Sequence, residues 1–151
     1  MSIKVNLKGD SKEFESGVSV AEIAKSIGAG LYKAACAGKV DGEVVDLRTP
    51  LTKDCNLEIL TFSEEEGKKA YWHTAAHVLA QAVKRLFPDA KLAIGPAIDN
   101  GFYYDIDLSR PLSQEDLPKI EAEMKKIIKE NLPIARFELA PNQAKTLMQE
   151  Q

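Results

Sequence analysis

The chain has 151 residues, of which 44% are hydrophobic and 28% charged, and a net charge of −3. This composition is typical of a soluble globular protein, and no apolar run approaches the length of a bilayer span. Residues 1–62 hold 8 Lys and Arg against 9 Asp and Glu, and residues 63–151 hold 12 against 14, which excludes a polybasic nucleic-acid-binding arm. Two cysteines without a Cys-x-x-Cys motif indicate neither a disulfide framework nor a zinc ribbon, and we expect a cytoplasmic protein.

The first sixty residues predict a small domain rich in β-structure. Alternating apolar residues and turn signals predict five strands, at residues 3–7, 12–14, 34–40, 43–45 and 57–62. Ser19 and Glu22 have the spacing of a capping box for a short helix that ends at Gly28. One helix packed on a small mixed sheet is the β-grasp, or ubiquitin-like, plan, so the predicted fold class is α+β.

A polar stretch at residues 63–69 separates this domain from the rest of the chain. It is either a junction or the acidic first turn of the next helix. We therefore divide the chain into domains at residues 1–62 and 63–151. The second domain begins with a long helix, predicted over residues 69–87 and stopped by Pro88.

The remaining residues predict short strands and two more helices. Strands are expected at residues 92–94, 102–106 and 134–139. Ser113 caps one helix, with Asp116 in the box position, and Asn142 caps the last one. That last helix has a start signal without a stop signal, which favours a chain cut from a longer protein.

The only two histidines, His73 and His77, lie four residues apart on the long predicted helix. The helix has an apolar stripe on the opposite face, formed by Ala75, Val78, Leu79, Ala82, Val83 and Leu86. Core histidines are therefore disfavoured, which leaves two solvated side chains or a functional pair. Small residues flank the pair, namely Ala70, Ala76 and Ala80. They leave room for another strand, a ligand or a metal.

Zinc binding is the first functional interpretation to test, since histidines at i and i+4 can bind one ion from a single helix. The metalloprotease form of this motif needs Glu after the first histidine, and Thr74 stands there. No third ligand follows at a recognisable spacing. The sequence therefore predicts no metal site within these residues.

The segment HTAAHVLAQAVKRLFPDAKLAIGPAIDNGFYYDID follows the predicted β-grasp domain. Together they closely resemble the N-terminal region of bacterial threonyl-tRNA synthetases, over essentially the whole chain. The resemblance implies a TGS domain at residues 1–62. It also implies that residues 63–151 are the first, incomplete part of an editing domain, whose histidine motif is shared with alanyl-tRNA synthetases.

In that family the editing site hydrolyses seryl-tRNA(Thr), and the resemblance implies that His73 and His77 are the first half of its catalytic set. The second half, a later Cys-x-x-x-His, is absent here, so we expect this chain to be inactive by itself. The aminoacylation core with its ATP, magnesium and zinc is absent too, so no cofactor is expected. The implied partner is tRNA(Thr), with no DNA or membrane. The family is homodimeric, whereas this chain is expected to be monomeric.

Gly95 and Tyr104 are candidates for substrate binding. A glycine lets the backbone approach an adenosine or ester closely, although Gly95 also suits a simple turn. Tyr104 has two interpretations: its hydroxyl reaches the edge of a pocket, or its ring is part of the core. The ring shares a strand face with Phe102 and Ile106, which favours the core.

Lys84 and Arg85 are candidates for tRNA contacts. With Lys68 and Lys69 they form the basic cluster nearest the histidines and are expected to meet acceptor-stem phosphates, although exposed helix lysines are commonly only solvated.

Two alternative functions remain open on the sequence. One is a stand-alone TGS-type module that binds RNA or a regulatory ligand without catalysis. The other is a zinc hydrolase of the alanyl editing type, assembled with another chain.

Overall fold

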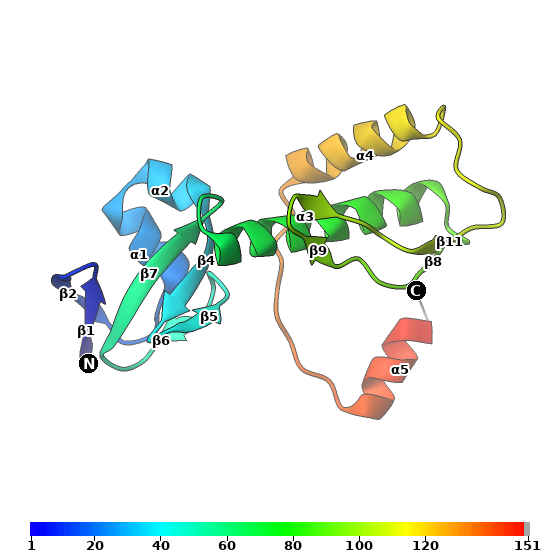
Figure 1. Ribbon diagram of the computed structural model, residues 1–151. Helices are drawn as coiled ribbons and strands as arrows, with labels where there is room; N and C mark the ends of the chain where they lie inside the picture. The colour runs from blue at the N-terminus through cyan, green and yellow to red at the C-terminus, as the bar shows by residue number, and fades with distance from the viewer. Residues whose placement is uncertain (150–151) are drawn as a thin grey trace.

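A computed structural model describes residues 1–149 of the chain (Figure 1). A sheet with two short helices forms the N-terminal part, and one long helix leads from it into the second part. None of the helices among these residues is both long and apolar enough to cross a membrane.

The N-terminal part is built on a five-stranded mixed sheet in the order β2-β1-β7-β4-β5. Its strands are β1 (Ser2–Leu7), β2 (Asp10–Glu15), β4 (Ala35–Val40), β5 (Glu43–Val45) and β7 (Cys55–Thr61). The central pair β1 and β7 is parallel, and the other neighbours are antiparallel. The β-grasp plan and the α+β class are therefore confirmed. Two further strands, β3 (Val18–Ser19) and β6 (Pro50–Leu51), pair with each other. They were not predicted, because two residues cannot show an alternating pattern.

Helix α1 (Val20–Ile27) begins at the predicted capping box. The Glu22 backbone N–H donates to Ser19 Oγ at 3.2 Å, and the Ser19 N–H donates to Glu22 Oε2 at 2.8 Å. The helix ends at Gly28 as expected. A second short helix, α2 (Ala29–Ala34), follows directly and was not predicted.

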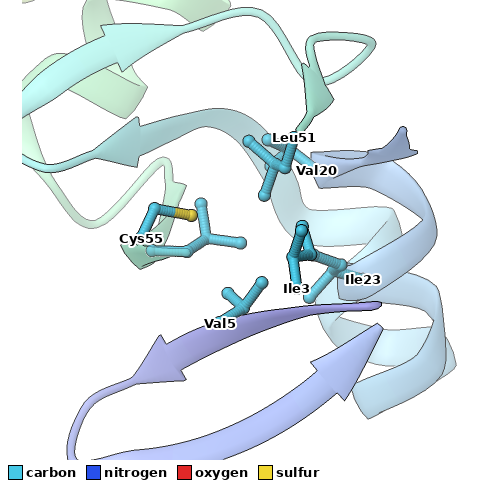
Figure 2. Close-up of a cluster of buried hydrophobic side chains, with 7 residues drawn as sticks. Ile3, Val5, Val20, Ile23, Leu51 and Cys55 are labelled. Atoms are coloured by element: carbon cyan, nitrogen blue, oxygen red, sulfur yellow. The ribbon is translucent and has the colours of Figure 1, made fainter. Parts of the chain in front are cut away.

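The apolar face of α1 packs on the sheet and closes the core of the N-terminal part (Figure 2). The buried residues of this core are Ile3, Val5, Val20, Ile23, Leu51, Cys55 and Leu57. Gly38 in β4 allows the helix to come close, because a Cβ at Gly38 would lie 2.8 Å from Val20 Cγ1. Adding a side chain there would push α1 off the sheet.

Helix α3 (Glu65–Leu86) begins four residues earlier than predicted, so the polar stretch is its first turn. The connection from β7 is tight: the backbone N–H and the hydroxyl of Thr61 donate to Glu64 Oε2 at 2.7 and 2.9 Å. A Cβ at Gly67 would lie 2.0 Å from the Thr61 carbonyl oxygen. Glycine is therefore required where the helix leaves the sheet.

The second part packs around α3. Its other elements are β8 (Lys91–Leu92), β9 (Ala97–Ile98), β10 (Gly101–Phe102), β11 (Ile106–Asp107), α4 (Leu117–Glu130) and α5 (Pro141–Gln149). Strands β9 and β10 form one pair, and β8 and β11 form another. Helix α4 lies alongside α3, while α5 lies apart from both at the end of an extended segment (Figure 1). The core between α3 and α4 contains Ala82, Val83, Ala90, Ile120 and Ile127.

Two strand predictions for the second part are wrong. Residues 134–139 form no strand, and Ile134 and Phe137 are 65% and 67% exposed. Their alternating pattern pairs with no strand among residues 1–149, and an unpaired strand is not stable in water. The predicted strand at residues 102–106 is interrupted, so that only its ends pair, in β10 and β11.

The two helix starts are displaced for local reasons. The Ser113 N–H does donate to Asp116 Oδ2 at 2.9 Å, but α4 begins only at Leu117, because Asp116 is also held by Arg110. Helix α5 begins at Pro141, one residue before its predicted cap, since proline is well suited to the first helical position. The predicted last helix extended to residue 151, and its final two residues lie outside the described part.

Candidate functional site

The histidine pair lies on the middle of α3, on a face that is exposed to solvent. Leu79 and Val83 point the other way, into the cluster shared with α4, which confirms that neither histidine belongs to the core. Leu86, at the end of the predicted apolar stripe, is exposed instead, because the helix core ends one turn earlier.

The two imidazoles touch each other. The Nε2 atoms of His73 and His77 are 3.2 Å apart, and the rings are nearly perpendicular at 87°. A hydrogen bond between two ring nitrogens needs one donor and one acceptor, so at least one ring must be neutral. The contact therefore allows one ring to donate to the other on an exposed helix face.

The surroundings of His77 favour its neutral form. Partial burial lowers the pKa of His77 below its ordinary value of about 6.5, and the nearby positive charge of protonated His73 lowers the pKa further. A neutral imidazole can accept a proton from a water molecule at neutral pH. A neutral imidazole is the form that general-base chemistry requires.

The alanines beside the pair are mostly covered. Ala76 and Ala80 are buried, and α3 packs against β9 and β10, whereas Ala70 is only half-buried. Packed strands are thus one of the three kinds of neighbour that these small residues were expected to admit. The open approach to the histidines is therefore from the solvent side of α3.

The structure brings no third metal ligand to the pair within residues 1–149, where no group of three His, Cys, Asp or Glu side chains could hold an ion. The two cysteines belong to the N-terminal part and not to the elements around the histidines. Cys55 is part of the N-terminal core, and Cys36 is half-buried on β4. Two imidazoles alone are an incomplete ligand set for a structural zinc site.

Gly95 and Tyr104 lie against each other. A Cβ at Gly95 would be 2.2 Å from Cδ2 of Tyr104, so the ring occupies the space that a larger residue would need. Tyr104 is half-buried and lines an open hollow together with Ala93 and Asp105. The lining of that hollow does not include His73 or His77.

Lys84 and Arg85 are engaged in packing contacts. Lys84 Nζ donates to the Ala90 carbonyl at 3.0 Å, which ties down the loop after α3. Arg85 donates to Glu130 at 2.8 and 2.9 Å and to Glu123 at 3.1 Å, and these carboxylates raise the pKa of Arg85 further. Both cations thus form contacts that stabilise the fold.

The four basic residues do not form one cluster. Lys69 and Lys84 are fifteen residues apart on the same helix, which separates them by about 22 Å at 1.5 Å per residue. Lys68 and Lys69 lie at the start of α3, and the histidines stand between the two pairs. The first pair lies beside a hollow in the surface.

That hollow was missed by sequence reasoning. It measures about 350 Å³ and lies between the start of α3 and the β9–β10 turn. Its lining residues are Ser63, Glu65, Lys68, Lys69, Ile98, Asp99 and Asn100. The sequence identifies Asp99-Asn100-Gly101 as a turn, but local pattern cannot say that this turn folds back onto a helix thirty residues earlier.

Comparison with known proteins shows that the chain is similar to one domain family and to several longer proteins. The TGS domain model matches residues 3–61. The threonine–tRNA ligase of Clostridioides difficile is 59% identical over 150 residues, which is 99% of this chain and 24% of that protein. The threonine–tRNA ligase of Acetivibrio thermocellus is 58% identical over 149 residues, 98% of this chain and 24% of that protein. A third such ligase, from Caldanaerobacter subterraneus, is 58% identical over 142 residues, 94% of this chain and 22% of its own length.

The chain thus spans about a quarter of the length of the relatives that it matches. The matched segments extend over 98% and 99% of the chain. They therefore include the β-grasp sheet, helix α3, on which both histidines lie, and the elements that follow it. The chain is therefore similar, over nearly its whole length, to the N-terminal region of threonine–tRNA ligases, and its residues 3–61 match the TGS domain.

Proposed function

We propose that this chain is the N-terminal region of a threonine–tRNA ligase and that His73 and His77 form half of a hydrolytic proofreading site for seryl-tRNA(Thr). The observation that supports this most is the contact between their Nε2 atoms, 3.2 Å apart on an exposed helix face. Residues 63–151 would then be the first part of an editing domain.

A threonine enzyme needs proofreading for a physical reason. Serine lacks one methyl group of threonine, and a missing methyl group weakens binding by only about 1–3 kcal/mol. A second site that accepts serine and excludes the extra methyl group can supply the remaining discrimination. Its reaction is the attack of water on the ester that joins serine to the tRNA.

The histidine pair suits that reaction. A neutral imidazole can take a proton from the attacking water, and a protonated one can donate to the developing oxyanion. The contact between the rings allows one to be neutral while the other carries the additional proton. The other half of the catalytic set would come from the part of the ligase that this chain does not contain.

The remaining assignments follow from the same proposal. The partner is tRNA(Thr), Gly95 and Tyr104 are candidate contacts for its terminal adenosine, and Lys84 and Arg85 are candidate contacts for its acceptor stem. ATP, magnesium and zinc would belong to the aminoacylation core of the longer, homodimeric and cytoplasmic enzyme. No cofactor is assigned to the residues of this chain.

The test is a misacylation assay on the ligase that carries this region. Replacing His73 and His77 by alanine should leave the rate of threonine attachment unchanged, while seryl-tRNA(Thr) accumulates. Gln81→Ala, an exposed change one turn further along α3, is the matched control and should accumulate none. If the double variant keeps seryl-tRNA(Thr) as low as the unchanged enzyme, the proposed function is wrong.

A further inference from the structure

The hollow between α3 and the β9–β10 turn lies next to the histidine pair, and nothing in the proposed function uses it. It is closed on one side by the first turns of α3 and on the other by Ile98, Asp99 and Asn100. Lys68 Nζ donates to Asn100 Oδ1 at 3.1 Å and so joins the two sides. The hollow is therefore a built feature and not a gap between unconnected segments.

Its lining contains groups for two kinds of ligand atom. The ammonium groups of Lys68 and Lys69 can bind phosphate oxygens, and the carboxylates of Glu65 and Asp99 can accept from hydroxyl groups. A bare anion would be repelled by both carboxylates, and a neutral sugar would form no ion pair with either lysine. A sugar that carries a phosphate satisfies both sets, and Ile98 adds an apolar surface beside them.

These groups are available to a ligand. Lys69 forms an ion pair with Glu65 at 2.7 Å, but the two side chains are 58% and 78% exposed. An exposed pair of this kind contributes little to stability, so exchanging it for contacts with a ligand costs little. The pair can thus open without disturbing α3.

The hollow also has the right position relative to the histidines. Lys69 precedes His73 by four residues, which places it one turn away, about 6 Å along the helix and on the same side. His77 follows one turn later. A ligand that reaches from the hollow along α3 therefore arrives at the imidazoles.

We propose that this hollow binds the ribose and phosphate of a nucleotide next to the terminal one, whose ester the histidine pair would hydrolyse. This inference rests on the proposed function and adds the place where the single-stranded 3′ end of the RNA is held. Lys69 and Lys68 bind the phosphate, while a carboxylate of Glu65 or Asp99 accepts the one hydrogen bond that the ribose 2′-hydroxyl can donate.

The test is an NMR titration of the 151-residue chain with the RNA trinucleotide CCA, the sequence at the 3′ end of tRNAs. Backbone amide shifts should concentrate at Ser63, Lys68 and Asn100, which line the hollow. The DNA trinucleotide of the same sequence should bind more weakly, because it lacks the 2′-hydroxyl.

Two lysine variants make the test specific. Lys69→Gln should weaken RNA binding about threefold to tenfold and reduce its salt dependence. Lys125→Gln is the matched control, because Lys125 also pairs with a glutamate four residues earlier, Glu121, and the two side chains are 73% and 65% exposed. This control lies on α4 and should leave the affinity unchanged.

The inference is overturned if CCA produces no shifts at the hollow, if Lys69→Gln and Lys125→Gln bind alike, or if RNA and DNA bind equally well. The misacylation assay on the histidine variant decides the proposed function separately. If CCA does not bind at the hollow but the histidine variant accumulates seryl-tRNA(Thr), the subsite is wrong and the proposed function stands. If CCA binds at the hollow but the histidine variant accumulates no seryl-tRNA(Thr), the hydrolytic role of the histidines is wrong.

Discussion

The two halves of the chain differ in how well they bury their apolar residues. Residues 1–62 close a core between one helix and a continuous five-stranded sheet. Residues 63–149 bury one seam between α3 and α4, but leave large apolar side chains such as Ile94, Ile134, Phe137 and Met148 exposed. Sheets explain the difference: the first half pairs five of its strands in one sheet, whereas the second has only isolated pairs of two residues each.

This contrast shows that an alternating apolar segment forms a strand where another strand pairs with it. Both halves carry alternating apolar residues and helix caps. In the first half each alternating segment finds a neighbour, as β1 does between β2 and β7. In the second half the segment at residues 134–139 has the same pattern without a neighbour among the described residues, and it stays extended and exposed.

The largest expected effect comes from removing a core side chain of the first half. Ile23→Ala should lower the free energy of unfolding by about 2–5 kcal/mol, because Ile23 is fully buried between α1 and the sheet. Ile134→Ala, the same change at an exposed position, should stay within about 0.5 kcal/mol. Urea unfolding of both variants measures the difference, and equal losses would contradict the contrast between the halves.

The next prediction concerns the connection between the two halves. Gly67→Ala should cost about 1–3 kcal/mol, since the new Cβ would overlap the Thr61 carbonyl and force α3 away from β7. Gly30→Ala in α2 meets open space, so it should be neutral or stabilise by up to about 1 kcal/mol. Thermal unfolding compares them. If Gly67→Ala is as mild as Gly30→Ala, the close contact between strand and helix does not hold the halves together.

The histidine pair should contribute little to folding. Replacing both His73 and His77 by alanine should cost less than about 1–2 kcal/mol, because both are exposed and their removal leaves no cavity against α4. A thermal melt of the double variant checks this. Unfolding of the variant at room temperature would instead assign the pair to the structure.

The smallest effect concerns the titration of His77. Its pKa lies below the ordinary value of about 6.5, so the unfolded chain binds the proton more tightly than the folded one. The stability that His77 contributes is therefore complete above about pH 6.5 and decreases as the pH falls from there through the folded-state pKa. An NMR titration should find this pKa and should show it rising in His73→Ala, though not to the ordinary value, since burial remains. An unchanged value would mean that His73 has no influence.

Several features of this protein could be predicted from short stretches of sequence. The capping box of Ser19 and Glu22 and the long helix with both histidines on its exposed face follow from patterns within a few residues. The β-grasp plan was predicted from the order of such elements along the chain. These patterns act through backbone hydrogen bonds and side-chain periodicity, which the local sequence encodes directly.

Only the tertiary structure decided which distant residues meet. Gly67 is confined by the Thr61 carbonyl, the Tyr104 ring fills the space at Gly95, and the Asp99-Asn100 turn closes a hollow against the start of α3. The same structure commits Arg85 to Glu130, and it left residues 134–139 without a strand partner. Such contacts depend on how separate elements pack together, and no periodicity within one element specifies its neighbour.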